Sequence, residues 1–142
     1  MQLNGVNMKV FMSYDHSEDR HYKELLRAWD ANTVFDFEFD HRSPNEAINR
    51  TEAVVIKQSL TRMMKQAEYL LVIIGKKSHE SKWIQWEIDR AKQQDIKLQL
   101  AAIKIENSFV TPNGLIGVGT SFTKAFTKDG IVTALKNANN KY

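Results

Sequence analysis

The chain has 142 residues, 42% of them hydrophobic and 26% charged, so it can bury the core of one domain spanning residues 1–142. It contains no cysteine, so disulfide bonds and thiolate catalysis are excluded, and we expect a cytoplasmic protein. A net charge of +3 with scattered lysines does not indicate nucleic-acid binding, and no apolar run approaches the roughly 18 residues of a membrane span.

The N-terminal part of the chain predicts a strand, a helix and a second strand. Residues 8–13 are apolar and predict the first strand, and Ser17 in the polar loop after it is the expected N-cap of the helix. Residues 34–39 alternate strictly, with three phenylalanines on one side and two acids on the other, which predicts a half-exposed strand at a sheet edge. The apolar face of the helix follows from i, i+3, i+4, i+7 spacing: Tyr22, Leu25, Leu26 and Trp29.

A second helix and a third strand follow a polar loop at residues 40–50. Thr51 is the expected cap of this helix. Residues 69–74 are continuously apolar, as expected of a central parallel strand that is covered on both faces. The buried face of the second helix is predicted to contain Ile56, Leu60, Met63, Met64 and Ala67.

The rest of the chain continues the alternation. Residues 81–91 predict a third helix, residues 98–105 and 120–126 predict two more strands, and residues 129–138 predict a last helix. Strands that alternate with helices form right-handed βαβ units, which build a parallel sheet. We therefore predict an α/β, flavodoxin-like fold with a five-stranded parallel sheet in the order 2-1-3-4-5 and helices on both faces.

Glu87 is the residue in the third helix that apolar packing alone does not explain. At roughly 100° per residue it lies about 40° from Trp83, inside an apolar arc. A carboxylate in such a position must be partnered, neutral or directed into a cavity. An ion pair with Arg90 or Lys82 and a functional role are both open from the helix alone. The predicted fold favours a functional role, because ligands bind at the carboxyl ends of the strands, where this helix begins.

Three segments resemble the motifs of TIR domains. Lys9-Val10-Phe11-Met12-Ser13-Tyr14-Asp15 resembles their first strand and loop, and Ser81-Lys82-Trp83 with Glu87 four residues after the tryptophan resembles their Ser-x-Trp…Glu helix. Ser43-Pro44-Asn45 falls where TIR domains carry a functional loop, with Asn45 where many of them have glycine. The resemblance covers about residues 9–105 and is closest to the TIR-like group that includes the signal-producing subunit of Thoeris antiphage systems.

This resemblance implies an NAD-consuming enzyme that cleaves the bond between nicotinamide and ribose. Nicotinamide leaves as a neutral molecule, so no general acid is needed, and one carboxylate can stabilise the ribosyl cation. The resemblance implies Glu87 as the catalytic residue and NAD as a substrate, with no cofactor and no metal. It also implies an ADP-ribose product, cyclic or linear, that signals to a separate effector, and self-association of the active enzyme. The residues expected near the substrate are Ser13, Tyr14, Asp15, Asn45 and Trp83.

Other interpretations of these residues remain open. Ser13 can simply end its strand, Asp15 can cap the first helix, and Trp83 can belong to the core. The four histidines show no metal-ligand spacing, and we expect them at the surface: His16, His21, His41 and His79. The alternative functions are a non-catalytic TIR-like adaptor that self-associates and a nucleoside deoxyribosyltransferase-like enzyme, which would need a further set of acidic residues.

Overall fold

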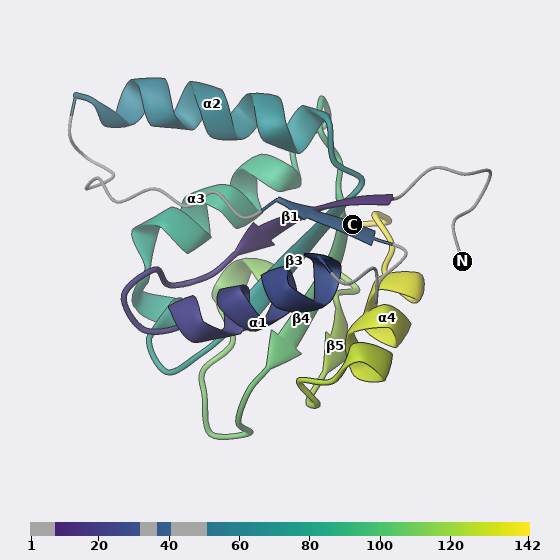
Figure 1. Ribbon diagram of the computed structural model, residues 1–142. Coiled ribbons are helices and arrows are strands. Elements are labelled where there is room, and N and C mark those ends of the chain that lie inside the picture. Colours follow the sequence, from purple (N-terminus) through teal and green to yellow (C-terminus); the bar gives the residue numbers. More distant parts are fainter. Residues whose placement is uncertain (1–7, 32–36, 41–50) are drawn as a thin grey trace.

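The computed structural model describes residues 8–31, 37–40 and 51–142, and they form one sheet with helices on both faces (Figure 1). The strands are β1 (Met8–Ser13), β2 (Phe37–Asp40), β3 (Tyr69–Ile74), β4 (Gln99–Lys104) and β5 (Ser121–Thr123). The helices are α1 (Arg20–Ala31), α2 (Ala53–Lys65), α3 (Lys82–Ala91) and α4 (Lys128–Lys136), with short 3₁₀ helices η1 (Ser78–Glu80) and η2 (Asn113–Leu115).

The sheet is parallel throughout and runs in the order β2-β1-β3-β4-β5. The α/β fold with a parallel sheet, predicted from the alternation of strands and helices, is confirmed. The register of β1 on β3 pairs Ser13 with Val72, so the carboxyl ends of both strands meet at one edge of the sheet. This edge lies at the switch point, where ligands bind in folds of this kind.

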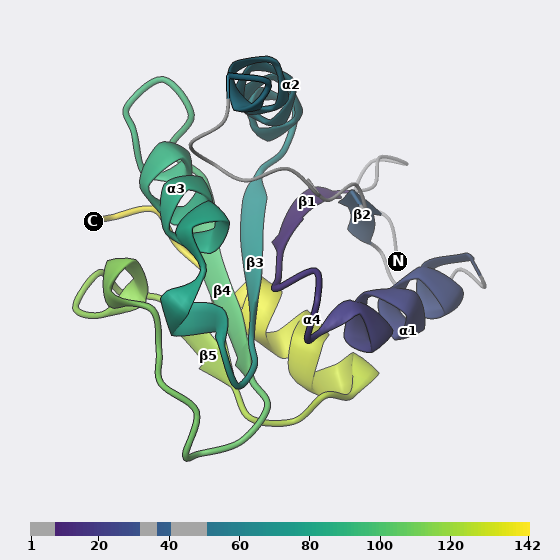
Figure 2. The same ribbon diagram turned by 90° about the vertical axis from the view of Figure 1, so that its left-hand side faces the viewer.

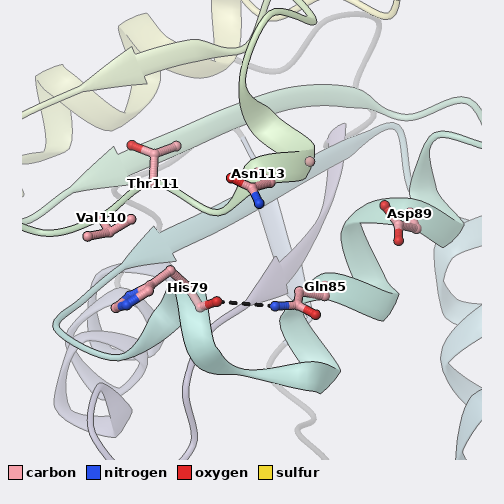
Figure 3. Close-up of a pocket in the computed structure, with 7 residues that line it drawn as sticks. His79, Gln85, Asp89, Val110, Thr111 and Asn113 are labelled. Carbon is pink, nitrogen blue, oxygen red and sulfur yellow. Dashed lines mark hydrogen bonds between the residues drawn. The ribbon is translucent and has the colours of Figure 1, made fainter.

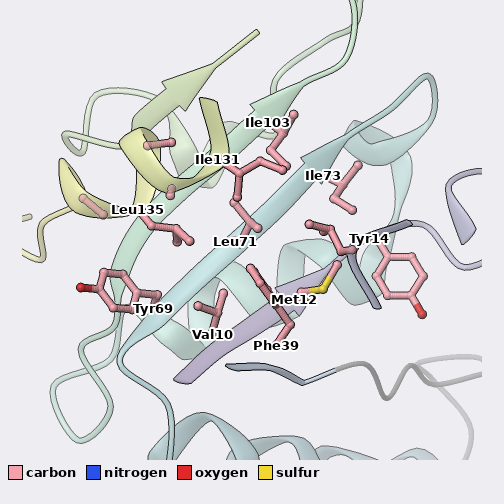
Figure 4. Packing of buried hydrophobic residues seen from close by; sticks show 14 residues of the cluster. Val10, Met12, Tyr14, Phe39, Tyr69, Leu71, Ile73, Ile103, Ile131 and Leu135 are labelled. Carbon is pink, nitrogen blue, oxygen red and sulfur yellow. The ribbon is translucent and has the colours of Figure 1, made fainter. Parts of the chain in front are cut away.

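Two apolar layers sandwich the sheet. Leu26 of α1 and Leu135 of α4 pack on one face, and Leu60 of α2 and Ile84 of α3 pack on the other (Figure 2). All six side chains of β3 are buried, because this central strand is covered on both sides. Figure 4 shows the first layer, in which Leu71 of β3 lies among side chains of β1 and α4.

Two helix starts differ from the sequence prediction. Helix α1 begins at Arg20, so the prediction of Ser17 as its N-cap is wrong. The Asp15 carboxylate accepts hydrogen bonds from the Ser17 amide (3.0 Å) and hydroxyl (2.7 Å), which forms a turn ahead of the helix. Helix α2 begins at Ala53 with Glu52 in the cap position, so Thr51 is not its cap either. The first difference arises because the Asp15 side chain serves a turn rather than a cap.

The buried faces of the helices largely follow their periodicity. Leu25 is the exception, with 44% of its surface exposed, because it lies at the edge of the apolar arc of α1, about 60° from Tyr22. Phe39 on the edge strand β2 is buried, whereas residues 34–36 of the predicted strand lie outside the described residues. Within the described ranges, no helix is long and apolar enough to cross a membrane.

Candidate active site

The Glu87 side chain lies inside the protein. Ser81 caps the start of helix α3, and its hydroxyl accepts a hydrogen bond from the Ile84 amide (3.2 Å), which fixes the first turn. One and a half turns later Glu87 faces the sheet and is only 3% exposed, beside the fully buried Ile84 and Ile88. The carboxyl is therefore covered by the protein rather than directed into an open cavity.

Ser13 is the hydrogen-bond partner that the structure gives to Glu87. The Ser13 hydroxyl donates to Oε1 of Glu87 across 2.7 Å, and Ser13 itself is fully buried at the end of β1. Among the described residues Glu87 forms no ion pair, and Arg90 instead binds Asp95 through two bonds of 2.8 and 2.9 Å. Glu87 therefore does not form the ion pair with Arg90 that was one interpretation of its position in the helix.

The environment of Glu87 favours its neutral form. Burial raises the pKa of Glu87 to about 8, and the hydrogen bond from Ser13 lowers it only in part. Near neutral pH the carboxyl is therefore mostly protonated. A cationic group brought against it would favour the carboxylate, because an opposite charge stabilises the ionised form.

The other predicted site residues are not gathered around Glu87. Tyr14 is 5% exposed and packs in the apolar layer under α1 and α4 (Figure 4). Ser13, by contrast, binds Glu87 of α3. Asp15 is used by the turn before α1. Trp83, one turn before Glu87 on α3, is half-buried against the layer of α2 and α3 and meets Trp86 edge to face, with centroids 5.9 Å apart. Asn45 lies outside the described residues.

A second buried carboxyl, which was not among the predicted site residues, lies at the same edge of the sheet. Asp19 is 4% exposed and lies against Gly75, where a Cβ atom would come within 2.1 Å of Oδ2. Oδ2 has no hydrogen-bond partner among the described residues, and burial, reinforced by the charge of Asp15, raises the pKa of Asp19 to about 6. A glycine directly after an apolar strand was the sequence signal for this close approach.

A cavity of about 460 Å³ lies beside α3, but Glu87 does not line it. It is bounded by η1, the outer face of α3 and the loop between β4 and β5 (Figure 3). Gln85 and Asp89 of α3 line the cavity. Each is two residues from Glu87 in the sequence, so each lies about 200° around the helix axis from Glu87. The cavity and the Glu87–Ser13 pair are therefore separate features on opposite faces of one helix.

The histidines are only partly at the surface. His21 is exposed as predicted, whereas His16 and His79 are half-buried, and His41 lies outside the described residues. No group of three or more histidine, aspartate or glutamate side chains in the described part of the chain could hold a metal ion.

The match to one family model agrees with the motifs. A sequence model of the family "Thoeris protein ThsB, TIR-like domain" matches residues 11–108. Among solved structures, the TIR domains in the activated Roq1 resistosome directly recognizing the pathogen effector XopQ are similar, at 13% identity and a TM-score of 0.44. That match covers 70% of this chain, which spans 60% of the length of the other. No curated protein matches.

Proposed function

We propose that this chain, which belongs to the family of TIR-like domains of the Thoeris protein ThsB, is an enzyme that cleaves the nicotinamide–ribose bond of NAD. Membership of this family supports a role in defence signalling. The observation that carries the enzymatic proposal is the buried Glu87 carboxyl, which has only a serine hydroxyl as its described partner. Retention of such a costly group in an apolar layer is typical of a functional carboxylate.

The proposed reaction needs one negative charge. The bond between C1′ of ribose and the pyridinium nitrogen breaks, and its electron pair neutralises the nicotinamide ring. The ribosyl group becomes an oxocarbenium-like cation, which the Glu87 carboxylate stabilises. Water then attacks C1′ and releases a proton to give ADP-ribose, or a hydroxyl or ring nitrogen of the same molecule attacks to give a cyclic product.

The resting state of Glu87 is unsuited to this reaction in two respects. The side chain is covered, and its carboxyl is mostly protonated near neutral pH. The positively charged nicotinamide ring would favour the carboxylate on arrival, and Ser13 would keep the ionised oxygen in place. We therefore propose that Ser13 is a positioning residue, and that uncovering Glu87 requires neighbouring copies of the chain or an activating signal.

The family suggests how the product is used. We propose that the product is a cyclic ADP-ribose isomer that signals to a separate effector protein in antiphage defence. NAD is the substrate, and we propose that no cofactor or metal takes part and that the reaction occurs in the cytoplasm. Infected-cell lysate is the natural source of an activating signal to test.

Two other functions compete with this one. A non-catalytic adaptor is less consistent with Glu87, because a purely structural buried carboxylate is usually paired with a cation. A nucleoside deoxyribosyltransferase-like enzyme is supported by one observation, namely a second buried carboxyl, Asp19, at the same edge of the sheet. Incubation with a deoxynucleoside and a free base would reveal that activity by formation of the exchanged nucleoside.

Product analysis after incubation with NAD tests the proposal. The protein is incubated with NAD alone and with infected-cell lysate, and the mixture is separated by chromatography and identified by mass spectrometry. Equimolar nicotinamide and a cyclic ADP-ribose isomer are expected under activating conditions. Linear ADP-ribose alone would indicate a plain glycohydrolase. Intact NAD under all conditions, with an assembled and folded protein, would favour the adaptor.

A further inference from the structure

We infer that the cavity between η1, α3 and the β4–β5 loop is a second ligand site, which takes the ribose and base of a nucleoside. Its volume of about 460 Å³ is within the range of sites for small organic molecules. The inference does not depend on NAD cleavage, because Glu87 lies on the opposite face of α3.

Hydrogen bonds and close packing fix the walls of the cavity to one another. The Lys92 ammonium donates a 2.8 Å hydrogen bond to the Gly114 carbonyl oxygen and so ties the β4–β5 loop to α3. Gly114 approaches α3 so closely that a Cβ atom would lie 2.7 Å from Cγ2 of Ile88. Behind it Leu115 is buried, and its carbonyl oxygen accepts a 2.9 Å bond from the Thr120 hydroxyl. A preformed site loses little conformational entropy when it binds.

The side chains in the cavity specify the kind of ligand. The Asp89 carboxylate only accepts hydrogen bonds, which suits the vicinal hydroxyls of a ribose. Gln85 donates through Nε2 to the His79 carbonyl oxygen (3.1 Å), which leaves its own amide oxygen as an acceptor (Figure 3). The Asn113 amide both donates and accepts, as the edge of a base requires.

Two further features narrow the choice to an uncharged ligand. Val110 lines the cavity with 52% of its surface exposed, and it provides an apolar surface for a base ring. The lining contains neither lysine nor arginine, and Asp89 would repel a phosphate group. A nucleoside without phosphates therefore fits the cavity better than a nucleotide does.

Adenosine is the probe for this inference, with binding to the ¹⁵N-labelled full chain followed by NMR. We expect saturable binding at up to ~10 mM, with the shifts centred on His79, Gln85, Asp89 and residues 110–114. 2′-Deoxyadenosine should bind about tenfold more weakly, because the carboxylate loses a hydroxyl partner, and AMP should also bind more weakly than adenosine. Absence of saturable shifts in this region would overturn the inference.

Variants separate this site from the proposed catalytic one. Asp89→Asn should remove the preference for adenosine over 2′-deoxyadenosine, and Asn113→Ala should weaken both. Glu87→Gln should bind adenosine as the parent does, so that loss of NAD cleavage and loss of adenosine binding report on different sites. A preference for adenosine that persists in folded Asp89→Asn, or binding that is lost in folded Glu87→Gln, would contradict the assignment.

Discussion

The Ser13 hydroxyl donates a 2.7 Å hydrogen bond to the Glu87 carboxyl, and this bond joins the end of β1 to the middle of α3 across 74 positions of the sequence. Both residues are polar groups at otherwise apolar positions, and each satisfies the other inside the core. The bond lies at the edge of the sheet where ligands bind in this fold. It therefore links the family motif on β1 to the candidate catalytic residue on α3.

Ser13→Ala should move the pH dependence of NAD cleavage. The Ser13 hydrogen bond lowers the pKa of Glu87, so its removal raises that pKa further above its present value of about 8. Because the reaction needs the carboxylate, the rising limb of the pH–rate profile should shift to higher pH, and activity near neutrality should fall. The profile of kcat/KM against pH, which reports pKa values of the free enzyme, measures this, with Ser108→Ala, which removes an exposed hydroxyl, as the control. An unchanged profile would remove Ser13 from the site.

Glu87→Gln should stabilise the fold in a manner that depends on pH. The pKa of Glu87 is raised from 4.5 to about 8 in the folded protein, so above pH 4.5 the unfolded chain gives up a proton that the folded chain keeps. The free energy of unfolding of the parent therefore falls as pH rises from 4.5 to about 8, by on the order of 1.4 kcal/mol for each pH unit in that interval.

Glutamine does not titrate, so the variant should be as stable as the parent below pH 4.5 and more stable near pH 8, by on the order of 4 kcal/mol. Urea denaturation across this pH range measures the difference. Glu68→Gln, which removes a carboxylate just before β3, controls for the change in net charge. A constant difference between parent and Glu87→Gln at all pH values would show that Glu87 does not titrate in this interval.

Gly75→Ala should destabilise the protein through Asp19. The new methyl group would come within 2.1 Å of Oδ2 of Asp19, so the buried carboxyl must move, at a cost of about 1–3 kcal/mol. In an Asp19→Ala background the space is free, and the same substitution should cost much less. A double-mutant cycle by urea denaturation measures the coupling, and additive effects would show that Gly75 and Asp19 do not interact.

Dilution should lower the specific activity. A carboxyl that is 3% exposed cannot reach NAD in the single chain, so we expect activity to depend on contacts between copies or on a trigger. The rate of nicotinamide release per molecule should fall as the assembly dissociates over about a hundredfold dilution. Light scattering on the same samples gives the oligomeric state. Constant specific activity in a verified monomer would contradict the need for assembly.

The local elements were predictable from the sequence because their signals are local. Six consecutive apolar residues identified β3, and the helical arc of residues 81–91 identified α3. The cap residue of α1 was not predictable, because a side chain such as Asp15 serves a turn as well as it serves a helix.

The partners of the site residues depend on long-range packing. Glu87 was recognisable as a polar residue in an apolar arc, but its contact with Ser13 depends on how α3 lies over β1. The approach of Asp19 to Gly75 and the cavity along residues 110–114 arise where loops meet, and no periodicity marks them. The family resemblance predicted from the motifs on β1 and α3 is confirmed by the match over residues 11–108.

The rate of NAD cleavage by Glu87→Gln, under conditions where the parent is active, tests the central claim most directly. Glutamine keeps the shape of the side chain and can accept the bond from Ser13, but it cannot carry the charge that stabilises the ribosyl cation. We predict a folded, assembled protein whose nicotinamide release is lower by orders of magnitude, while Glu68→Gln behaves as the parent. Near-parental cleavage by Glu87→Gln would contradict the assignment of Glu87 as the catalytic residue.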